Sequence, residues 1–323
     1  MPNETLETNA QASFSSAPSR RGGIRIALVV LALVLLVLLV LGPLFPGPVG
    51  TFAAILRPWL WLPSALVALG ALFARRWRSS VALAIPLGLW SVLVLPGVIP
   101  PLQHPGGVSK GLTVASLNVH AGSDADTVSA QAGALEHQGA DVIALVELDQ
   151  NSRSVAARTL ADSYPYSSTV GTVGLWSRFP LHAEQPLELG LGWKRALQVT
   201  VDSPAGSVSL YALHAASVRA GDQEARDLML SDLADAIRQD SSPRILAIGD
   251  FNAVADDPAM AGVRELLEEP RQSVPSFGMT WPSAFPLARI DHVYQRGLTP
   301  VSNIVQDIPG SDHRAVVASF EAA

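Results

Sequence analysis

Polar side chains occur at the ends of six apolar segments in the second half of the chain. They are Asn118, Glu147, His214, Asp250 with Asn252, Asp291, and Asp312 with His313. Rigid strands position the loops that follow them, so ligand sites in layered α/β folds cluster at strand ends. Carboxylate and amide oxygens are the ligands that Mg²⁺ prefers, and carboxylate and imidazole groups can transfer protons. The set therefore predicts metal-assisted proton-transfer chemistry at one site.

Any one of these residues taken alone has a purely structural explanation. An isolated Asp or Asn after a strand more often forms a turn or caps a helix than performs chemistry. We expect that role for four other aspartates, Asp124, Asp126, Asp256 and Asp257. The chemical interpretation therefore requires that the whole set lies together in space.

The segments that must position these residues alternate between strands and helices. Strands are expected at 112–119, 141–147, 170–177, 196–201, 208–213, 244–248, 288–294 and 314–320. Helical spacing of apolar residues, a capping residue or an early proline predicts helices at 127–137, 219–238 and 258–267. Strands with interspersed helices predict an α/β (α+β) domain with two sheets, and residues 110–323 are long enough for one domain.

The order of the polar residues along the chain resembles a known superfamily. Six segments occur in the order found in the endonuclease/exonuclease/phosphatase superfamily: Leu117-Asn118, Val146-Glu147, Leu213-His214, Gly249-Asp250-Phe251-Asn252, Arg289-Ile290-Asp291 and Ser311-Asp312-His313. The segments Gly174–Pro180 and Thr280–Pro282 are also similar to it. The resemblance covers residues 111–321 and implies a four-layer α/β/β/α sandwich of the DNase I-like type. It does not identify the substrate.

The chemistry of the individual residues agrees with this resemblance. Phosphodiesters are anionic and hydrolyse slowly, so an enzyme must neutralise charge, activate a water and stabilise the developing oxyanion. Glu147 is a hard oxygen ligand for Mg²⁺, and Asn118 can supply a carbonyl to the metal or an amide N–H to the phosphate. Asp250 can take a proton from the attacking water, while Asn252 holds the water or the phosphate in line.

A histidine and an aspartate complete the predicted acid–base machinery. His313 can donate a hydrogen bond to a non-bridging phosphate oxygen. Asp291 can accept from the other ring nitrogen, which fixes the tautomer and favours the imidazolium form. By resemblance, His214 is a second contact to the phosphate or the leaving group, and Asp312 is an additional ligand of the metal or a water. The implied cofactor is Mg²⁺, with Mn²⁺ as an alternative.

Several neighbouring residues have open roles. Arg178, Lys194 and Arg195 can contact a substrate phosphate, although solvated charge is the ordinary role of such residues. His120 stands where some relatives have an aspartate, so it is either a peripheral ligand or a loop residue. His292 follows Asp291, and we expect it to pack rather than react.

The first hundred residues are a different kind of sequence. A helix needs about 20 residues to cross roughly 30 Å of hydrocarbon. Long uncharged runs predict three transmembrane helices, at about 24–44, 53–74 and 79–100, within a membrane region over 24–103. Residues 1–23 are polar and are expected to form a disordered cytoplasmic tail. The lipid bilayer is therefore an expected partner of this chain.

Arginines flank the uncharged runs unevenly and predict their orientation. Three precede the first run and three more lie within 75–78, whereas the loop between the first two runs holds only Arg57. By the positive-inside rule, the N-terminus and the 75–78 connection are cytoplasmic, and the domain after the third crossing is extracytoplasmic. A cleaved signal peptide is the alternative for the first run. That run is long, has no clear small-x-small cleavage site and precedes two further runs, which favours a retained anchor.

Composition excludes several classes of protein. Charged residues make up 15% of the chain, below the roughly 25% of ordinary soluble domains, and apolar residues make up 49%. The chain has no cysteine, which excludes a disulfide framework, cysteine zinc sites and a thiol nucleophile. From residue 110 onward there are 15 basic and 26 acidic residues, a net charge of about −11, unlike a surface that neutralises nucleic-acid phosphates.

Two functional hypotheses follow from the sequence. The first is a membrane-tethered, metal-dependent phosphoesterase that hydrolyses phosphodiesters or phosphomonoesters outside the cytoplasm. The second is a non-catalytic binding or sensory module that retains the fold. Within the first, a nuclease and a phospholipid or sphingomyelin phosphodiesterase both remain open. No obligate protein partner is implied.

Overall fold

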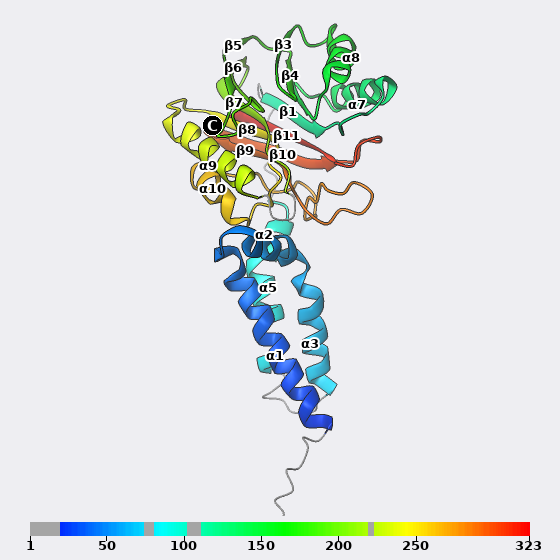
Figure 1. Ribbon diagram of the computed structural model, residues 1–323, viewed down its shortest axis with the longest axis vertical. Coiled ribbons are helices and arrows are strands. Elements are labelled where there is room, and N and C mark those ends of the chain that lie inside the picture. Colours follow the sequence, from blue (N-terminus) through cyan, green and yellow to red (C-terminus); the bar gives the residue numbers. More distant parts are fainter. Residues whose placement is uncertain (1–19, 74–80, 102–110, 219–222) are drawn as a thin grey trace, which may run out of the picture.

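The computed structural model describes residues 20–73, 81–101, 111–218 and 223–323 (Figure 1). A bundle of apolar helices forms one end of the molecule, and a layered α/β domain lies at the other end. The expected tail at 1–23 lies mostly outside the described residues, as does the 75–78 connection, but helix α1 already begins at Arg20.

The first sheet of the domain has six strands in the order β10-β11-β1-β2-β4-β3. Their bounds are β1 (Gly111–Asn118), β2 (Val142–Val146), β3 (Tyr166–Val170), β4 (Val173–Ser177), β10 (Leu298–Gln306) and β11 (Ala315–Ala322). β1 and β2 are parallel and are joined by α7 (Ala125–His137), while α8 (Gln150–Leu160) follows β2. Apolar residues of both helices pack on the outer face of this sheet.

The second sheet has five strands in the order β5-β6-β7-β8-β9. They are β5 (Leu181–Leu187), β6 (Ala196–Ser203), β7 (Gly206–His214), β8 (Ile245–Asp250) and β9 (Asp291–Arg296). β7 and β8 are parallel and are joined by α9 (Glu224–Gln239). This helix covers the outer face together with the 3₁₀ turn η3 (Pro258–Met260) and α10 (Ala261–Leu266).

The two sheets pack face to face over an apolar core. Val114 and Leu175 of the first sheet and Val199, Leu210 and Ile248 of the second are fully buried in one cluster between them. Alternate residues of the central strands point outward to the helices, so these strands are buried on both faces. The order helix, sheet, sheet, helix confirms the predicted four-layer α/β/β/α sandwich.

The sequence-based elements differ from the structure at several places. The expected strand 170–177 is a hairpin, β3 and β4, that turns at Gly171 with φ of +55°. Helix α8 and the strands β5 and β10 were not expected. Both strands are largely exposed and contain a proline, so they lack the apolar alternation of a buried strand.

Three helical segments are long and apolar enough to cross a membrane, at Gly23–Val40, Gly47–Leu72 and Val81–Val98. They comprise α1 (Arg20–Val40), α2 (Gly47–Leu56), α3 (Trp61–Phe73), α5 (Ile85–Leu93), α6 (Leu95–Val98) and the 3₁₀ turns η1 (Gly42–Leu44) and η2 (Arg57–Leu60). The second segment begins earlier than the expected 53 and is not one straight helix. Pro58 lies in η2, which separates α3 from α2, and α2 runs across the end of the bundle that faces the domain (Figure 1).

Helix α2 is docked on the α/β domain through a buried arginine. Arg226 of α9 is 0% exposed and donates from Nη2 to the Thr51 hydroxyl of α2 at 3.1 Å. Its Nη1 donates to Asp257 Oδ2 at 2.9 Å and to the backbone oxygen of Asn252 at 3.1 Å. At the surface nearby, Arg57 pairs with Asp256 at 2.6 Å. The apolar helical bundle is therefore linked to the loop that follows β8.

The four aspartates expected to have structural roles differ in what they contact. Asp124 caps α7, accepting from the N–H of Thr127 at 2.8 Å. Asp257 caps η3 and is also the buried partner of Arg226. Asp126 lies in the first turn of α7, where a negative charge is favourable.

A cluster of buried charged residues connects β9 to the loop that follows β8. Glu269 Oε1 accepts from His292 Nδ1 at 2.8 Å and from Arg289 Nε at 2.8 Å, while His292 Nε2 donates to the backbone oxygen of Ala253 at 2.9 Å. Burial alone raises the pKa of Glu269, but the charges of Arg289 and His292 outweigh burial and lower the pKa to about 2. His292 therefore packs as expected, with both ring nitrogens bonded.

We expect Glu269→Gln to destabilise the protein by about 3–5 kcal/mol at pH 7, because it leaves buried cations without their counter-charge. A carboxyl group with a lowered pKa stabilises the fold above its unfolded pKa and loses that effect as pH falls. The difference between the two proteins should therefore shrink between about pH 4.5 and 2. Thermal unfolding in detergent measures it, with the exposed Glu265→Gln as control. Equal stability of Glu269→Gln and wild type at pH 7 would contradict the assignment.

Candidate active site

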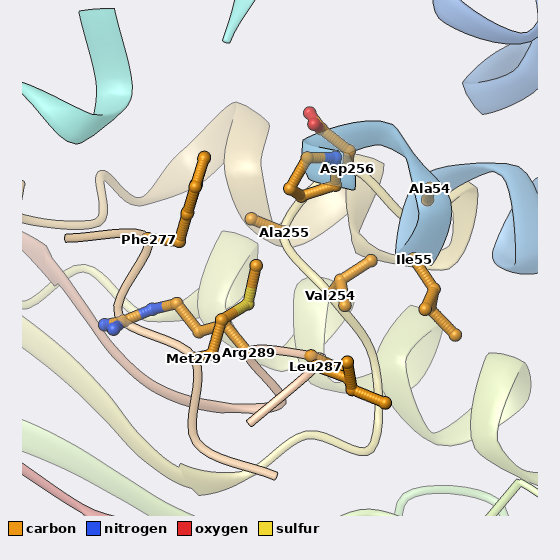
Figure 2. A pocket seen from close by; sticks show the side chains of 11 residues that line it. Ala54, Ile55, Val254, Ala255, Asp256, Phe277, Met279, Leu287 and Arg289 are labelled. Carbon is orange, nitrogen blue, oxygen red and sulfur yellow. The ribbon is translucent and has the colours of Figure 1, made fainter. Parts of the chain in front are cut away.

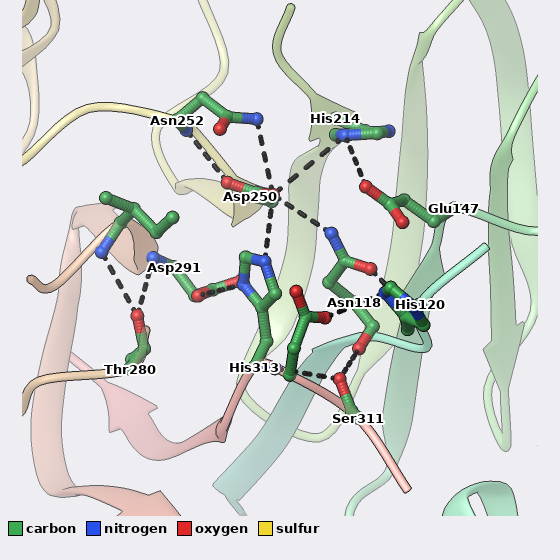
Figure 3. A network of polar contacts seen from close by, with 12 residues as sticks. Asn118, His120, Glu147, His214, Asp250, Asn252, Thr280, Asp291, Ser311 and His313 are labelled. Atoms are coloured by element: carbon green, nitrogen blue, oxygen red, sulfur yellow. Dashed lines mark hydrogen bonds and ion pairs between the residues drawn. The ribbon is translucent and has the colours of Figure 1, made fainter. Parts of the chain in front are cut away.

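Strand register brings the predicted polar residues to one edge of the sandwich. β1 and β2 pair Asn118 with Val146, so Glu147 follows at the next position. In the second sheet, Asp250 is paired with His214 of β7 on one side and with Asp291 of β9 on the other. Figure 3 shows these side chains pointing toward one another from both sheets, together with those of Asn252 and His313.

His313 lies between two buried carboxylates. Its Nδ1 donates to Asp291 Oδ2 at 2.9 Å, and its Nε2 lies 4.0 Å from Asp250 Oδ2. Asp291 is held in turn by Thr280, whose hydroxyl accepts from the Asp291 N–H at 3.2 Å. Burial lowers the pKa of His313, but the charge and hydrogen bond of Asp291 outweigh burial and raise it to about 9. His313 is therefore charged at neutral pH.

Asp250 is the central acceptor of the network. Its Oδ1 accepts from the Asn252 N–H at 2.8 Å, and its Oδ2 accepts from the Asn118 amide at 3.1 Å and from the Asn252 amide at 3.3 Å. Asp250 is 1% exposed, and burial, followed by the charge of Asp291, raises its pKa to about 7. A base works best when its pKa is close to the operating pH, so this environment suits Asp250 to proton transfer.

The carboxylate of Glu147 is more accessible than those of Asp250 and Asp291. Its side chain is 23% exposed, its Oε2 accepts from the Ala121 N–H at 2.9 Å, and its Oε1 lies 3.5 Å from His214 Nε2. Burial opposes ionisation, but hydrogen bonds from Asn118 and Ala121 lower the pKa of Glu147 below its usual value. Asn118 itself directs its amide toward the carboxylates and its carbonyl toward the His120 N–H at 3.0 Å.

Arg195 belongs to this group, although the sequence alone does not distinguish it from Arg178 and Lys194. Its Nη2 donates to His214 Nε2 at 2.9 Å and also contacts Nδ1. Burial, and then the charge of Arg195, lower the pKa of His214 to about 3. His214 is therefore a neutral imidazole at physiological pH. The guanidinium also lies 4.9 Å from the ring centre of Trp193, which is exposed to solvent. Its sequence signal is only a basic pair that precedes β6.

The remaining predicted residues lie at the rim or elsewhere. Asp312 is partly exposed, with Oδ1 3.0 Å from His120 Nδ1, so these two residues form a pair at the edge of the group. Arg178 is not brought to the group. Its guanidinium lies 3.7 Å from Asp141 and 5.2 Å from the ring centre of Tyr164. β4 is antiparallel to β2, so the end of β4 meets the beginning of β2, opposite to Glu147. This corrects the expectation that Arg178 binds substrate there.

The backbone is strained at the residues that the network uses. Glu147 and Asn252 have φ angles of +62° and +49°, in the left-handed region that non-glycine residues seldom adopt. Gly249, with φ of +137°, precedes Asp250, and a Cβ there would lie 1.9 Å from the Leu213 carbonyl oxygen. Such strain persists where surrounding structure enforces it, typically at functional sites.

The donor set fits a divalent cation. Asp250, Asp291 and His313 are buried and offer ligand atoms within 4.8 Å of one another. His313 is protonated and bonded to Asp291, so the oxygen of the partly exposed Glu147 beside this cluster is the donor best suited to a cation. Asp291 Oδ1 is buried and has no hydrogen-bond partner among the described residues. Burial and the charge of Asp291 raise the pKa of Asp250, so the charged carboxylate is destabilised here. A bound cation would stabilise it. Hard oxygen donors of this kind suit Mg²⁺ or Mn²⁺ rather than softer metals.

A comparison with protein-family models decides the classification. The model of the endonuclease/exonuclease/phosphatase family matches residues 115–313, which is more than half of the chain. The chain belongs to this family. As a member of the endonuclease/exonuclease/phosphatase family it is a hydrolase that acts on phosphoester bonds. No curated protein sequence gives a significant match.

Solved structures with the same fold support the classification. Caenorhabditis elegans TDP2 is 16% identical, covers 66% of this chain and 98% of its own, and has a TM-score of 0.56. D. rerio TDP2 complexed with a single-strand DNA product is 18% identical, covers 66% and 99%, and has a TM-score of 0.54. Beta toxin from Staphylococcus aureus is 14% identical, covers 64% and 99%, and has a TM-score of 0.51. At these identities the likeness shows the fold.

Proposed function

We propose that this protein is a membrane-tethered, divalent-metal-dependent phosphoesterase whose site lies on the extracytoplasmic side. The observation that supports the proposal most is the relay in which Asp291 bonds His313 and His313 faces Asp250, with Glu147 nearby on the other sheet. A module that only binds ligands has no need for a buried carboxylate of raised pKa beside a buried imidazolium.

The residues of the chain divide the proposed reaction between them. Asp250 accepts a proton from the attacking water, since its pKa of about 7 matches neutral pH. Asn252 holds that carboxylate through two hydrogen bonds and contacts the water or phosphate. His313 donates from Nε2 to a non-bridging phosphate oxygen, and Asp291 keeps it charged and oriented. His214, neutral and bonded to Arg195, contacts the phosphate or leaving group.

Glu147 is the proposed principal ligand of the metal, with Asn118 and Asp312 as further ligands. The lowered pKa of Glu147 keeps its carboxylate charged, as a ligand of Mg²⁺ or Mn²⁺ must be. When bound, the cation neutralises charge that develops on the phosphoryl oxygens. The pair His120 and Asp312 lies at the rim, where it can contact an outer water of the ion.

The proposed sidedness rests on where the arginines lie in the helical bundle. Arg20 and Arg25 belong to the first turns of α1, at the end of the bundle remote from the catalytic domain (Figure 1). The C-terminal end of α3 lies at that same remote end. Since basic residues mark the cytoplasmic side, the catalytic domain is placed on the opposite side of the membrane.

A substrate panel tests this function. We expect the full chain to hydrolyse bis(4-nitrophenyl) phosphate, and at least one natural phosphoester, in Mg²⁺ or Mn²⁺ and to lose that activity with a chelator. The panel contains single- and double-stranded DNA, RNA, inositol phosphates, phospholipids and sphingomyelin, with Asp250→Asn as control. No turnover of any phosphoester with either metal would favour a non-catalytic module that keeps the fold.

A nuclease is a second candidate because of one feature of the site. Trp193 is 49% exposed and stacks on Arg195, an arrangement that can accept a nucleobase. Binding of a nucleic acid should weaken steeply as salt concentration rises. The turnover of a lipid without net charge, such as sphingomyelin, should depend little on salt concentration. Salt dependence across the panel therefore separates the two classes.

A further inference from the structure

The catalytic domain contains a long segment without charge between β8 and β9. The 16 residues from Ser273 to Ala288 include no Asp, Glu, Lys or Arg, although Arg271 and Arg289 flank them closely. The rest of the domain is rich in acidic residues. An uncharged segment of this length that is partly exposed requires an explanation, because solvated loops ordinarily carry charge.

One part of this uncharged segment lies at the end of the apolar helical bundle. The ring centre of Phe277 lies 6.2 Å from that of Trp59 in η2 and 6.4 Å from that of Trp90 in α5. Trp90 falls within the candidate membrane span Val81–Val98. Trp59 Nε1 also donates to the backbone oxygen of Leu287 at 2.9 Å. The segment is therefore packed against the end of the helical bundle that faces the domain.

An apolar pocket marks the same junction. Figure 2 shows Ala54 and Ile55 of α2 facing Val254, Met279 and Leu287 of the domain across it. The pocket is continuous with the uncharged segment, which supplies Met279 and Leu287. Apolar residues of the bundle and of the domain thus face each other at this junction, with Asp256 and Arg289 also lining the pocket.

The other part of the segment borders the candidate active site. The Ser283 N–H donates to the Asp312 backbone oxygen at 2.7 Å, and the Ser283 hydroxyl donates to the Ser311 backbone oxygen at 2.7 Å. Thr280 bonds Asp291, as described above. The same loop therefore contacts both the membrane helices and the residues that hold His313 and Asp291.

Between these two attachments the segment exposes large apolar side chains. Phe285 is 71% exposed, Trp281 is 40% exposed and Leu287 is 39% exposed. Single exposed apolar residues are ordinary, but three in one uncharged loop beside membrane helices are not. Aromatic residues of this kind are enriched at membrane interfaces, where one face of the ring is apolar and the surroundings are wet.

We propose that the loop Trp281–Leu287 inserts into the outer surface of the bilayer and that the substrate is a phosphoester lipid of that leaflet. The acyl part of the lipid stays among the apolar residues of the loop while its phosphate reaches the site bordered by Ser283. This substrate assignment rests on the proposed phosphoesterase activity, whereas the membrane contact rests only on the proposed membrane tethering. Tethering and insertion together raise the local concentration of such a lipid.

The absence of cysteine from the sequence makes the membrane contact directly measurable. We would label Phe285→Cys with an environment-sensitive nitrobenzoxadiazole dye in the full chain, reconstituted in phosphatidylcholine and phosphatidylglycerol vesicles that contain a nitroxide lipid. We expect blue-shifted emission that the nitroxide quenches. The control is Tyr166→Cys, since Tyr166 is also an exposed aromatic residue (40%) but lies on β3, at the far edge of the first sheet. Equal emission and quenching at both positions would overturn the insertion.

A second measurement tests the substrate class. The ratio of vesicle phosphatidylglycerol turnover to bis(4-nitrophenyl) phosphate turnover should fall about tenfold in Phe285→Ser/Leu287→Ser, and should not change in Tyr166→Ser. Turnover of the soluble diester or of DNA without turnover of any vesicle phospholipid overturns the lipid assignment. Failure to hydrolyse every phosphoester contradicts the proposed function instead, and the dye measurement then still decides the membrane contact.

Discussion

Asp250→Asn should lower the turnover of a phosphodiester by about 10³-fold or more, because the amide cannot accept a proton from the attacking water. The substitution keeps the shape of the side chain, and an amide oxygen can still accept from the Asn252 N–H, which now bonds Asp250 at 2.8 Å. Initial rates with bis(4-nitrophenyl) phosphate and Mg²⁺ measure the effect.

Stability separates this loss from misfolding. Burial and the charge of Asp291 raise the pKa of Asp250, so the charged carboxylate destabilises the fold at and above neutral pH. The neutral asparagine should therefore leave the thermal midpoint unchanged or higher. Asp162→Asn, in an exposed turn after α8, is the matched control and should retain full activity. Activity of Asp250→Asn close to that of wild type would exclude Asp250 as the base.

His313→Gln should also lower turnover by about 10³-fold, since it removes a charged donor aimed at the phosphate. Asp291→Asn tests how that charge is maintained. The carboxylate of Asp291 raises the pKa of His313 to about 9, so its removal should lower that pKa. The alkaline limb of the pH–rate profile, which reports loss of the His313 proton, should then move to lower pH.

The control for this pair is His182→Gln, which replaces an exposed histidine on β5 that pairs with Asp202 at 3.0 Å. It should leave both the rate and the profile unchanged. An alkaline limb at the same pH in wild type and Asp291→Asn would show that Asp291 does not set the charge of His313.

The sequence alone was sufficient to predict the strands that are buried on both faces and to identify the polar residues at their ends. β2 is apolar throughout and is followed directly by Glu147, whereas β1, β7 and β8 are largely apolar and end on Asn118, His214 and Asp250. Parallel pairing then places Asn118 beside Glu147 and His214 beside Asp250. Local pattern and strand polarity together were enough to assemble most of the network.

What the sequence did not reveal depends on contacts between distant elements. Arg195 reads as one of many surface cations, and only the packing of β6 against β7 places it on His214. Arg178 has the same sequence character, yet strand direction carries it to the opposite end of β2. The second apolar segment divides at Pro58 in η2, but the docking of α2 on the domain depends on the contact of Thr51 with Arg226.

The uncharged segment illustrates a further limit. Its composition is visible in the sequence, but its role is indicated by two contacts: Phe277 lies against the apolar helical bundle, and Ser283 lies against the site. Neither contact follows from propensity or periodicity. A loop joined to two separate functional regions is detected only when both are positioned in space.

The metal dependence of turnover in Glu147→Gln tests the central claim most directly. The account places a divalent cation on the Glu147 carboxylate beside the phosphoester, so loss of that charge should raise the half-saturating Mg²⁺ or Mn²⁺ concentration at least about tenfold. Glu184→Gln, which replaces an exposed glutamate on β5, should leave that concentration unchanged. Hydrolysis that needs no metal, or an identical metal requirement in wild type and Glu147→Gln, would contradict the account.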